Sequence, residues 1–283
     1  MNTVDPAQAR RARLEHWRGH PGVLAGAIVA SAALLVFAFS AGYGFGGILE
    51  QFRTMAIDSV FDDRGDGEPP YEAIWGTFGL LGTIAAGALA GTAVRRYQGR
   101  PKSPAFPAVL AMAATTVGLW VSSLGWLPPL AVGIAVDPVF HTDEKWGFWG
   151  WAMYYADWWA PAGLLVLTVL ALVHAVKATR EYAEMVRTRE RLLTYGRRVR
   201  GEVVEVKPRI AGDESGSRVV GATVTVAFFD TAGVRRWVTR RTSETSIAGF
   251  VEVLFDPVRP GDEKSIFVAL RREPALSDWL PTD

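Results

Sequence analysis

Three long stretches without a charged side chain constrain what this chain of 283 residues can fold into. They run from residue 22 to 47, from 73 to 94 and from 103 to 136, and a shorter fourth stretch runs from 160 to 176. In a water-soluble protein, core residues alternate with polar residues at helical or strand period. A transmembrane helix instead needs about 20 consecutive apolar residues. The pattern therefore predicts a membrane α-helical bundle with four transmembrane helices.

We expect these spans at about residues 22–44, 73–94, 106–127 and 153–176, within a transmembrane domain over residues 22–176. A cleaved signal peptide is the alternative for the first span, because Ala38-Phe39-Ser40 resembles a cleavage site. However, the apolar run is longer than the roughly 7–15 residues of such peptides. Residues 130–136 are apolar but too short to cross a bilayer, so they form either a re-entrant segment or a surface loop.

Lysine and arginine are divided unevenly between the loops. The N-terminal tail (residues 1–21), the 95–102 loop and residues 177–200 hold sixteen of them, whereas the two other loops hold Arg53, Arg64 and Lys145. Because Lys and Arg collect on the cytoplasmic side, this count predicts a multi-pass protein of a bacterial inner membrane with both termini in the cytoplasm. Such an arrangement requires an even number of spans, in agreement with the four apolar runs.

Two features inside the spans bear on packing and function. Small residues recur every fourth position in the second span, at Gly79, Thr83, Gly87 and Gly91, which predicts a seam for close helix packing. Asp157 lies among aromatic residues near the start of the fourth span. An ionisable group at membrane depth is a functional hypothesis by default, whereas the same residue at the interface has only a surface role.

Beyond the last span, the periodicity of the sequence changes from helical to strand-like. Residues 177–195 lack Gly and Pro and carry a narrow apolar stripe, so we expect a helical connector, either a coiled stalk or a helix that lies on its own β-domain or on headgroups. Strands are expected near residues 199–206, 219–229, 235–242, 250–255 and 265–270. Five short strands within residues 196–272 predict an all-β domain, a small barrel of the OB or SH3 type, with a sandwich as the alternative and a tail at 273–283.

The β-domain also resembles a known family through its turn and strand signatures. These are the run Gly201-Glu202-Val203-Val204-Glu205-Val206, an aromatic strand end before Gly233, and Asp256-Pro257 followed by Pro260. They resemble an uncharacterised family of bacterial membrane proteins, domain of unknown function 3592, although Phe255 stands where that family usually has Tyr. The resemblance implies a fold and a membrane setting, but no activity. For Asp256-Pro257 itself, we predict a structural role, because an Asp side chain can cap the backbone amides that follow it.

Catalytic templates are missing from the sequence. No H-E-x-x-H, G-x-S-x-G or phosphate-binding glycine motif is present, so we predict neither an enzyme nor a cofactor. His141 lies close in sequence to Asp137, Asp143 and Glu144, which makes this loop a candidate site for a divalent cation, with a solvated loop as the simpler interpretation. The absence of cysteine excludes disulfides.

Charge also bears on the partners to expect. The chain has a formal net charge of only +1, which gives no general support for nucleic-acid binding. A local patch is formed by Arg235, Arg236, Arg240 and Arg241 around Trp237, and proximity to anionic lipid is the simpler account of it. The sequence thus predicts a membrane-anchored interaction or assembly module that contacts lipid and a membrane or cytosolic protein, alone or as an oligomer. The alternative is a component of a transporter for a small solute or ion, with Asp157 near the path.

Overall fold

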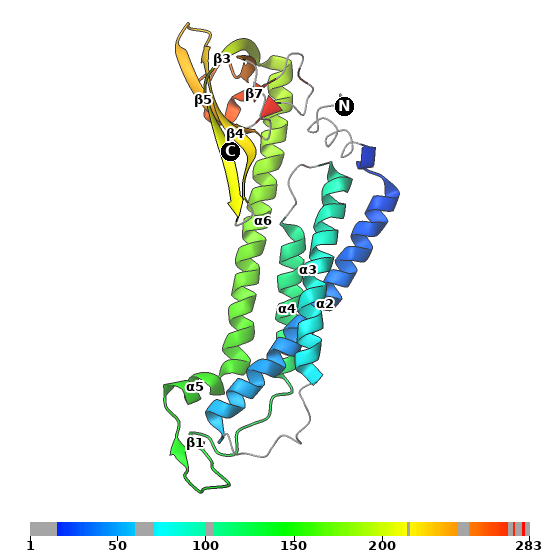
Figure 1. Cartoon of the computed structure of the whole chain (residues 1–283), viewed down its shortest axis with the longest axis vertical. Helices are drawn as coiled ribbons and strands as arrows, with labels where there is room; N and C mark the ends of the chain where they lie inside the picture. The colour runs from blue at the N-terminus through cyan, green and yellow to red at the C-terminus, as the bar shows by residue number, and fades with distance from the viewer. Residues whose placement is uncertain are drawn as a thin grey trace. The chain divides into compact units, whose positions relative to one another are not determined.

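The computed structural model describes residues 16–59, 71–99, 105–213, 216–242, 249–270, 274 and 279–280. The chain divides into a helical unit, residues 10–177, and a β unit that contains residues 178–283 (Figure 1). Most of the predicted N-terminal tail at 1–21 lies outside the described residues. The same is true of Arg64, Arg100 and Lys102, which entered the charge count.

Among the described residues, four helices are long and apolar enough to cross a membrane, in agreement with the four predicted spans. They are α2 (Pro21–Ile57), α3 (Tyr71–Gln98), α4 (Phe106–Ser123) and α6 (Ala156–Tyr195). Helices α2, α3 and α4 pack side by side (Figure 1). The Gly19 amide donates a hydrogen bond to the Tyr97 carbonyl at 3.0 Å, so the start of α2 lies beside the end of α3.

The helix boundaries differ from the predicted spans at several ends. Helix α2 continues through Glu50 and Arg53 to Ile57, beyond the expected end near residue 44. A charged residue marks where an apolar run stops, but it does not interrupt backbone hydrogen bonding, so the helix is longer than the span. The aromatic segment before the last span forms a separate short helix, α5 (Phe148–Tyr154).

Residues 130–136 form a loop rather than a helix. Within it, β1 (Ile134–Ala135) pairs antiparallel with β2 (Glu144–Lys145). This pairing favours the loop interpretation over a re-entrant segment.

Small residues allow the helices of the helical unit to approach closely. A Cβ atom added at Gly42 would overlap the Thr115 carbonyl, and one added at Gly118 would overlap the Phe39 carbonyl, so α2 and α4 touch backbone to backbone. Gly79 meets the backbone of Ala41 in the same way between α3 and α2.

The β unit is a curled antiparallel sheet. Its strands are β3 (Arg197–Asp213), β4 (Gly216–Phe229), β5 (Arg235–Thr242), β6 (Phe250–Phe255), β7 (Phe267–Ala269) and β8 (Trp279–Leu280), in the order β5-β4-β3-β6-β7-β8. The five predicted strands are present, with a register shift between Val203 and Glu205 in the first of them. The sixth, β8, lies in the segment predicted as a tail, because two residues are too short to show strand alternation.

The inner face of the sheet holds the core of the β unit. Phe228 and Phe255 pack with ring centroids 5.3 Å apart among buried valines of β4, β5 and β6. A second cluster joins the end of α6 to the sheet, where Leu192 is buried with Phe267 and Trp279. The connector helix therefore lies on its own β-domain, one of the three arrangements expected from its apolar stripe.

Candidate functional site

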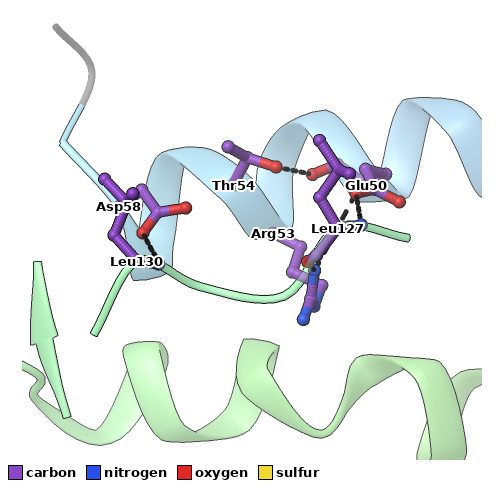
Figure 2. Close-up of polar contacts among 6 residues, drawn as sticks. All are labelled: Glu50, Arg53, Thr54, Asp58, Leu127 and Leu130. Carbon is purple, nitrogen blue, oxygen red and sulfur yellow. Dashed lines mark hydrogen bonds and ion pairs between the residues drawn. The ribbon is translucent and has the colours of Figure 1, made fainter. Parts of the chain in front are cut away.

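A hydrogen-bonded polar group of the helical unit lies at the C-terminal end of α2 (Figure 2). We call it the α2-end cluster, and its side chains are those of Glu50, Arg53, Thr54 and Asp58. Arg53, Thr54 and Asp58 come three, four and eight positions after Glu50, a spacing that places side chains on one face of a helix. That face meets the chain that leaves α4.

Within this cluster, Glu50 and Arg53 hold one residue of the facing loop from both sides. The Glu50 Oε1 accepts a hydrogen bond from the Leu127 amide at 2.7 Å, and the Arg53 Nη1 donates to the Leu127 carbonyl at 2.8 Å. The two side chains also form a weak ion pair, with Nη1 and Oε1 3.9 Å apart. Because Pro128 and Pro129 follow without N–H groups, Leu127 is the last residue before Leu130 that can donate from its backbone.

Asp58 and Trp146 continue the attachment toward the end of α2. The Asp58 Oδ1 accepts from the Leu130 amide at 3.2 Å, and the Trp146 Nε1 donates to the Ile57 carbonyl at 2.7 Å. Arg53 is 5% exposed and Asp58 is 3% exposed, so both charges are buried. Burial of charge is costly unless the groups are hydrogen-bonded, and the backbone of the loop supplies these bonds.

The α2-end cluster has spare hydrogen-bonding capacity as well. The Nε of Arg53 and the Nε1 of Trp126 are buried and have no hydrogen-bond partner among the described residues. The Arg53 guanidinium carbon lies 5.6 Å from the centroid of the Trp126 ring, within cation–π range. Chemically the cluster acts as a clamp on the loop, since the hydrogen bonds of Glu50, Arg53 and Asp58 to Leu127 and Leu130 all end on the loop backbone.

The sequence predicted a loop between the first two spans, from about residue 45 to 72, and did not single out Glu50, Arg53 or Asp58 within it. The pattern that could have identified them is their helical spacing, which continues the periodicity of α2 beyond Gly46 and Gly47. Their partners are backbone groups of a loop more than seventy residues away, and a sequence alone does not indicate such contacts.

The candidate metal residues form a self-contained turn. Asp137 accepts hydrogen bonds from the amides of Val139 and Phe140 and from the Thr142 hydroxyl, at 2.6–3.0 Å. Hydrogen bonds from the Phe140 amide, and then from Thr142, hold the pKa of the Asp137 carboxyl below its ordinary value. The Asp143 carboxylate accepts from the Asp137 amide at 2.9 Å, instead of turning toward a shared centre.

The other two candidates in this loop are exposed. His141 lies at a positive φ of 55° and Glu144 lies in β2. Within the described part of the chain, no group of three or more His, Asp or Glu residues is arranged so that it could hold a metal ion. The four residues thus form a hydrogen-bonded turn with exposed neighbours, and the cation site stays a prediction.

Asp157 lies in the first turn of α6 and is half-buried. One carboxylate oxygen, Oδ1, is buried and finds no hydrogen-bond partner among the described residues. Further along the same face of α6, the hydroxyl groups of Thr168 and Thr116 are 3.0 Å apart, which ties α6 to α4.

The residues of the predicted small-residue seam lie on α3. Gly79 and Gly91 are buried, and the Thr83 hydroxyl donates to the Gly79 carbonyl at 2.7 Å. A Cβ atom added at Gly87 would lie 3.7 Å from the Leu34 side chain. Gly79 and Gly87 thus lie at the contact with α2.

The outer face of the sheet in the β unit carries a second candidate site, which sequence reasoning did not assemble. We call it the aromatic–arginine face, and it consists of Arg200, Phe229, Arg235, Trp237 and Phe250. The three aromatic side chains are 55–60% exposed. They come from β4, β5 and β6, and antiparallel register brings them together, with Phe229 opposite Arg235 and Phe250 opposite Glu202.

Cations of this face stack on its rings. The Arg200 guanidinium carbon lies 3.8 Å from the centroid of Phe250, and that of Arg235 lies 5.6 Å from the centroid of Trp237. Arg235 also approaches Glu202, with Nη2 and Oε2 3.8 Å apart. A hollow of about 140 Å³ opens between Arg200, Phe229 and Phe250.

The predicted basic patch around Trp237 is largely engaged within the β unit. The Arg236 Nε donates to the Asp230 Oδ2 at 2.7 Å, a hydrogen bond that lowers the pKa of Asp230. Arg240 is buried and donates to the carbonyls of Glu263 and Ile266. The patch therefore offers fewer free cations than its sequence suggests.

The β-domain signature residues have structural positions. The Asp256 Oδ1 accepts from the Val258 amide at 2.9 Å, which confirms the predicted cap at Asp256-Pro257, and Pro260 lies in the turn that follows. Gly233 has a φ of 75° in the β4–β5 turn. A Cβ atom on Gly201 would lie 2.7 Å from Val226 and from Val253, so only glycine fits there.

Comparison of the chain with protein-family models, with curated proteins and with solved structures finds no match.

Proposed function

We propose that the chain is a multi-pass protein of a bacterial inner membrane, with both termini in the cytoplasm, whose β unit binds a protein partner. Four helices long and apolar enough to cross a membrane fit the multi-pass arrangement. The uneven distribution of Lys and Arg supports the orientation. For the β unit we propose an open barrel of the OB or SH3 type and membership of the family it resembles, domain of unknown function 3592. In support of the barrel, Cα atoms of the edge strands β5 and β8 come within 8 Å of each other.

The single observation that carries the proposed binding role is the exposed aromatic–arginine face. Aromatic residues and arginine are enriched at protein–protein interfaces and dominate their binding energy. Nucleic acid and anionic lipid are less suitable partners, because Arg235 lies near Glu202 and Lys207 lies 3.0 Å from Glu205 on the same sheet. This pairing lowers the net positive charge that either partner would require.

Site-specific photo-crosslinking in cells, with the full chain, tests this role. A photoreactive amino acid at Phe229 should give a discrete crosslinked product. The same group at Val258, which is 83% exposed in a turn of the same unit, should not. Trp237→Ala should weaken the product at Phe229 by an amount on the order of 2 kcal/mol in affinity, as expected for a central aromatic anchor. Equal products at both positions, or none at Phe229, would contradict the proposal.

One observation favours a second function, transport of a small solute or ion. The buried, unpartnered Oδ1 of Asp157, in the first turn of α6, is the kind of group expected at the mouth of an ion or proton path in membrane proteins. In proteoliposomes loaded with a pH-sensitive dye, this function predicts a proton flux that Asp157→Asn abolishes. Identical traces for the native chain, the variant and empty liposomes would exclude proton transport. Crosslinking at Phe229 should be unaffected by Asp157→Asn if binding is the function.

A further inference from the structure

A surface of large aromatic side chains is exposed where α5 leads into α6. We call it the aromatic platform, and its members are Phe148, Trp149, Trp151, Tyr155 and Trp158. Phe148 is 82% exposed and Trp158 is 70% exposed. Helix α5 contains no charged residue. A water-facing surface of this kind is unfavourable, so the platform requires an apolar or amphipathic neighbour.

The aromatic platform is held in place by contacts with the buried Trp146. Trp146 lies beneath it, 8% exposed, and its Nε1 donates to the Ile57 carbonyl at 2.7 Å. The Trp151 and Tyr154 rings pack on Trp146 with centroids 5.2 and 5.4 Å away. Gly150 is required for this packing, because a Cβ atom there would lie 2.7 Å from the Trp146 Cβ.

A further hydrogen bond joins α5 to α6. The Trp159 Nε1 donates to the Ala152 carbonyl at 2.7 Å, across the turn between the two helices. The direction in which Phe148 and Trp149 project is therefore fixed by contacts of α5 with α2 and with α6, both within the helical unit.

The depth of the platform follows from the length of α6. Thr168 is the midpoint of the uncharged run from residue 160 to 176, and Ala156 lies twelve residues before it. At about 1.5 Å per residue this is about 18 Å along the helix. Half of a hydrocarbon core of about 30 Å is about 15 Å, so α5 lies just beyond the hydrocarbon if Thr168 is at the bilayer centre. Trp and Tyr side chains prefer this layer.

We propose that the aromatic platform inserts into the lipid headgroup layer on the non-cytoplasmic side and fixes the position of the α2-end cluster at that surface. The occupant is lipid rather than protein, because the platform continues directly into the exposed apolar side chains of α6, including Leu165 and Val166. This inference rests on the membrane insertion proposed above.

The chain has no cysteine, so single spin labels can be placed without background labelling. Labels are placed at Phe148, at Val139 in the Asp137 loop and at Leu167, near the middle of the uncharged run of α6. They are compared in liposomes by collision with oxygen, which enriches in lipid, and with a nickel chelate, which enriches in water. The ratio of oxygen to nickel collisions should be highest at Leu167. At Phe148 it should be several-fold higher than at Val139.

Each outcome decides a different point. A high ratio at Leu167 with equal, low ratios at Phe148 and Val139 overturns the platform and leaves membrane insertion intact. A low ratio at Leu167 overturns membrane insertion itself. A label at Phe148 that neither reagent reaches indicates a protein neighbour and overturns the lipid assignment. Gly150→Ala should lower the ratio at Phe148 and leave Leu167 unchanged, as expected if Trp146 sets the direction of α5.

Discussion

The two units of this chain bury opposite kinds of side chain. The buried hydrophobic residues of the helical unit are mostly alanine, and glycine brings helix backbones together at Gly42, Gly79 and Gly118, while many of its leucine, valine and aromatic residues are exposed. The β unit buries valine, phenylalanine, leucine and tryptophan. Each unit is therefore stabilised by a different kind of packing.

This difference is the one expected from two solvents. In water, removal of apolar surface drives large side chains inward. In lipid there is no such drive between helices, so close approach of small residues and polar contacts must hold them together. If the helical unit is inserted in lipid as proposed above, burial of a residue contributes differently to stability on either side of Lys177, and variants can test this.

The largest effect is expected in the β unit, from Phe228→Ala. Phe228 is 1% exposed in the inner core, and loss of a buried phenylalanine costs about 3–5 kcal/mol. Hydrogen exchange of β4 amides in the full chain should show this loss of local stability. Phe229→Ala, at the neighbouring exposed position, should cost less than about 0.5 kcal/mol. If both variants lost a similar amount of stability, the sheet would not have distinct inner and outer faces.

A smaller effect, about 3 kcal/mol, is expected in the helical unit from Gly118→Leu. The new side chain would collide with the Phe39 carbonyl and separate α4 from α2. The matched control is Gly26→Leu, since Gly26 has open space around it on the same helix bundle. Thermal unfolding of the helical signal in detergent distinguishes the two. If the Gly118 variant were as stable as the Gly26 variant, backbone contact would not be what holds these helices together.

The α2-end cluster differs from both kinds of packing, because it places charged side chains in an apolar setting. Arg53→Met keeps the apolar stem and removes the hydrogen bond to the Leu127 carbonyl. We expect a loss of about 2 kcal/mol, typical of a hydrogen bond to a charged group, or about 30-fold faster hydrogen exchange of the Leu127 amide. Arg96→Met, at an exposed position in the last turn of α3, is the control. Unchanged exchange at Leu127 would mean that Glu50 alone holds the loop.

Much of the fold was predictable because the surroundings of a helix or strand leave a pattern of apolar and polar residues in its own sequence. Uncharged runs indicated four helices, and alternation in segments such as 219–229 and 250–255 indicated strands that the structure contains. The separate helix α5 and the strand β8 were missed. Helix α5 has only seven residues and merges with the next apolar run, and β8 is defined by Trp279 packing on residues distant in sequence.

The candidate sites were less predictable for a related reason. The aromatic–arginine face depends on register, which pairs Phe229 with Arg235 and Ala227 with Trp237 across the β4–β5 hairpin. The sequence shows the basic patch around Trp237 but not that Arg240 is buried against backbone carbonyls. The type of a residue indicates which contacts its side chain can make, whereas the fold determines which partner the side chain contacts.

The smallest expected effect concerns pH and the turn between β4 and β5. The Arg236 hydrogen bond holds the pKa of Asp230 below its ordinary value near 3.8, with further bonds from the amides of Val234 and Ala232. A lowered pKa in the folded state means that the stabilising contribution is complete above the ordinary value and is lost as pH falls through the folded value. Asp230→Asn should therefore speed exchange of the Ala232 and Val234 amides at pH 7, after correction for intrinsic rates. This difference from the native chain should shrink as the pH falls below about 4.

In Arg236→Gln the stabilising contribution of Asp230 should begin to be lost at a higher pH than in the native chain, since the largest cause of the lowered pKa is removed. A difference between Asp230→Asn and the native chain that does not change with pH would show that the negative charge of the Asp230 carboxylate contributes nothing to it.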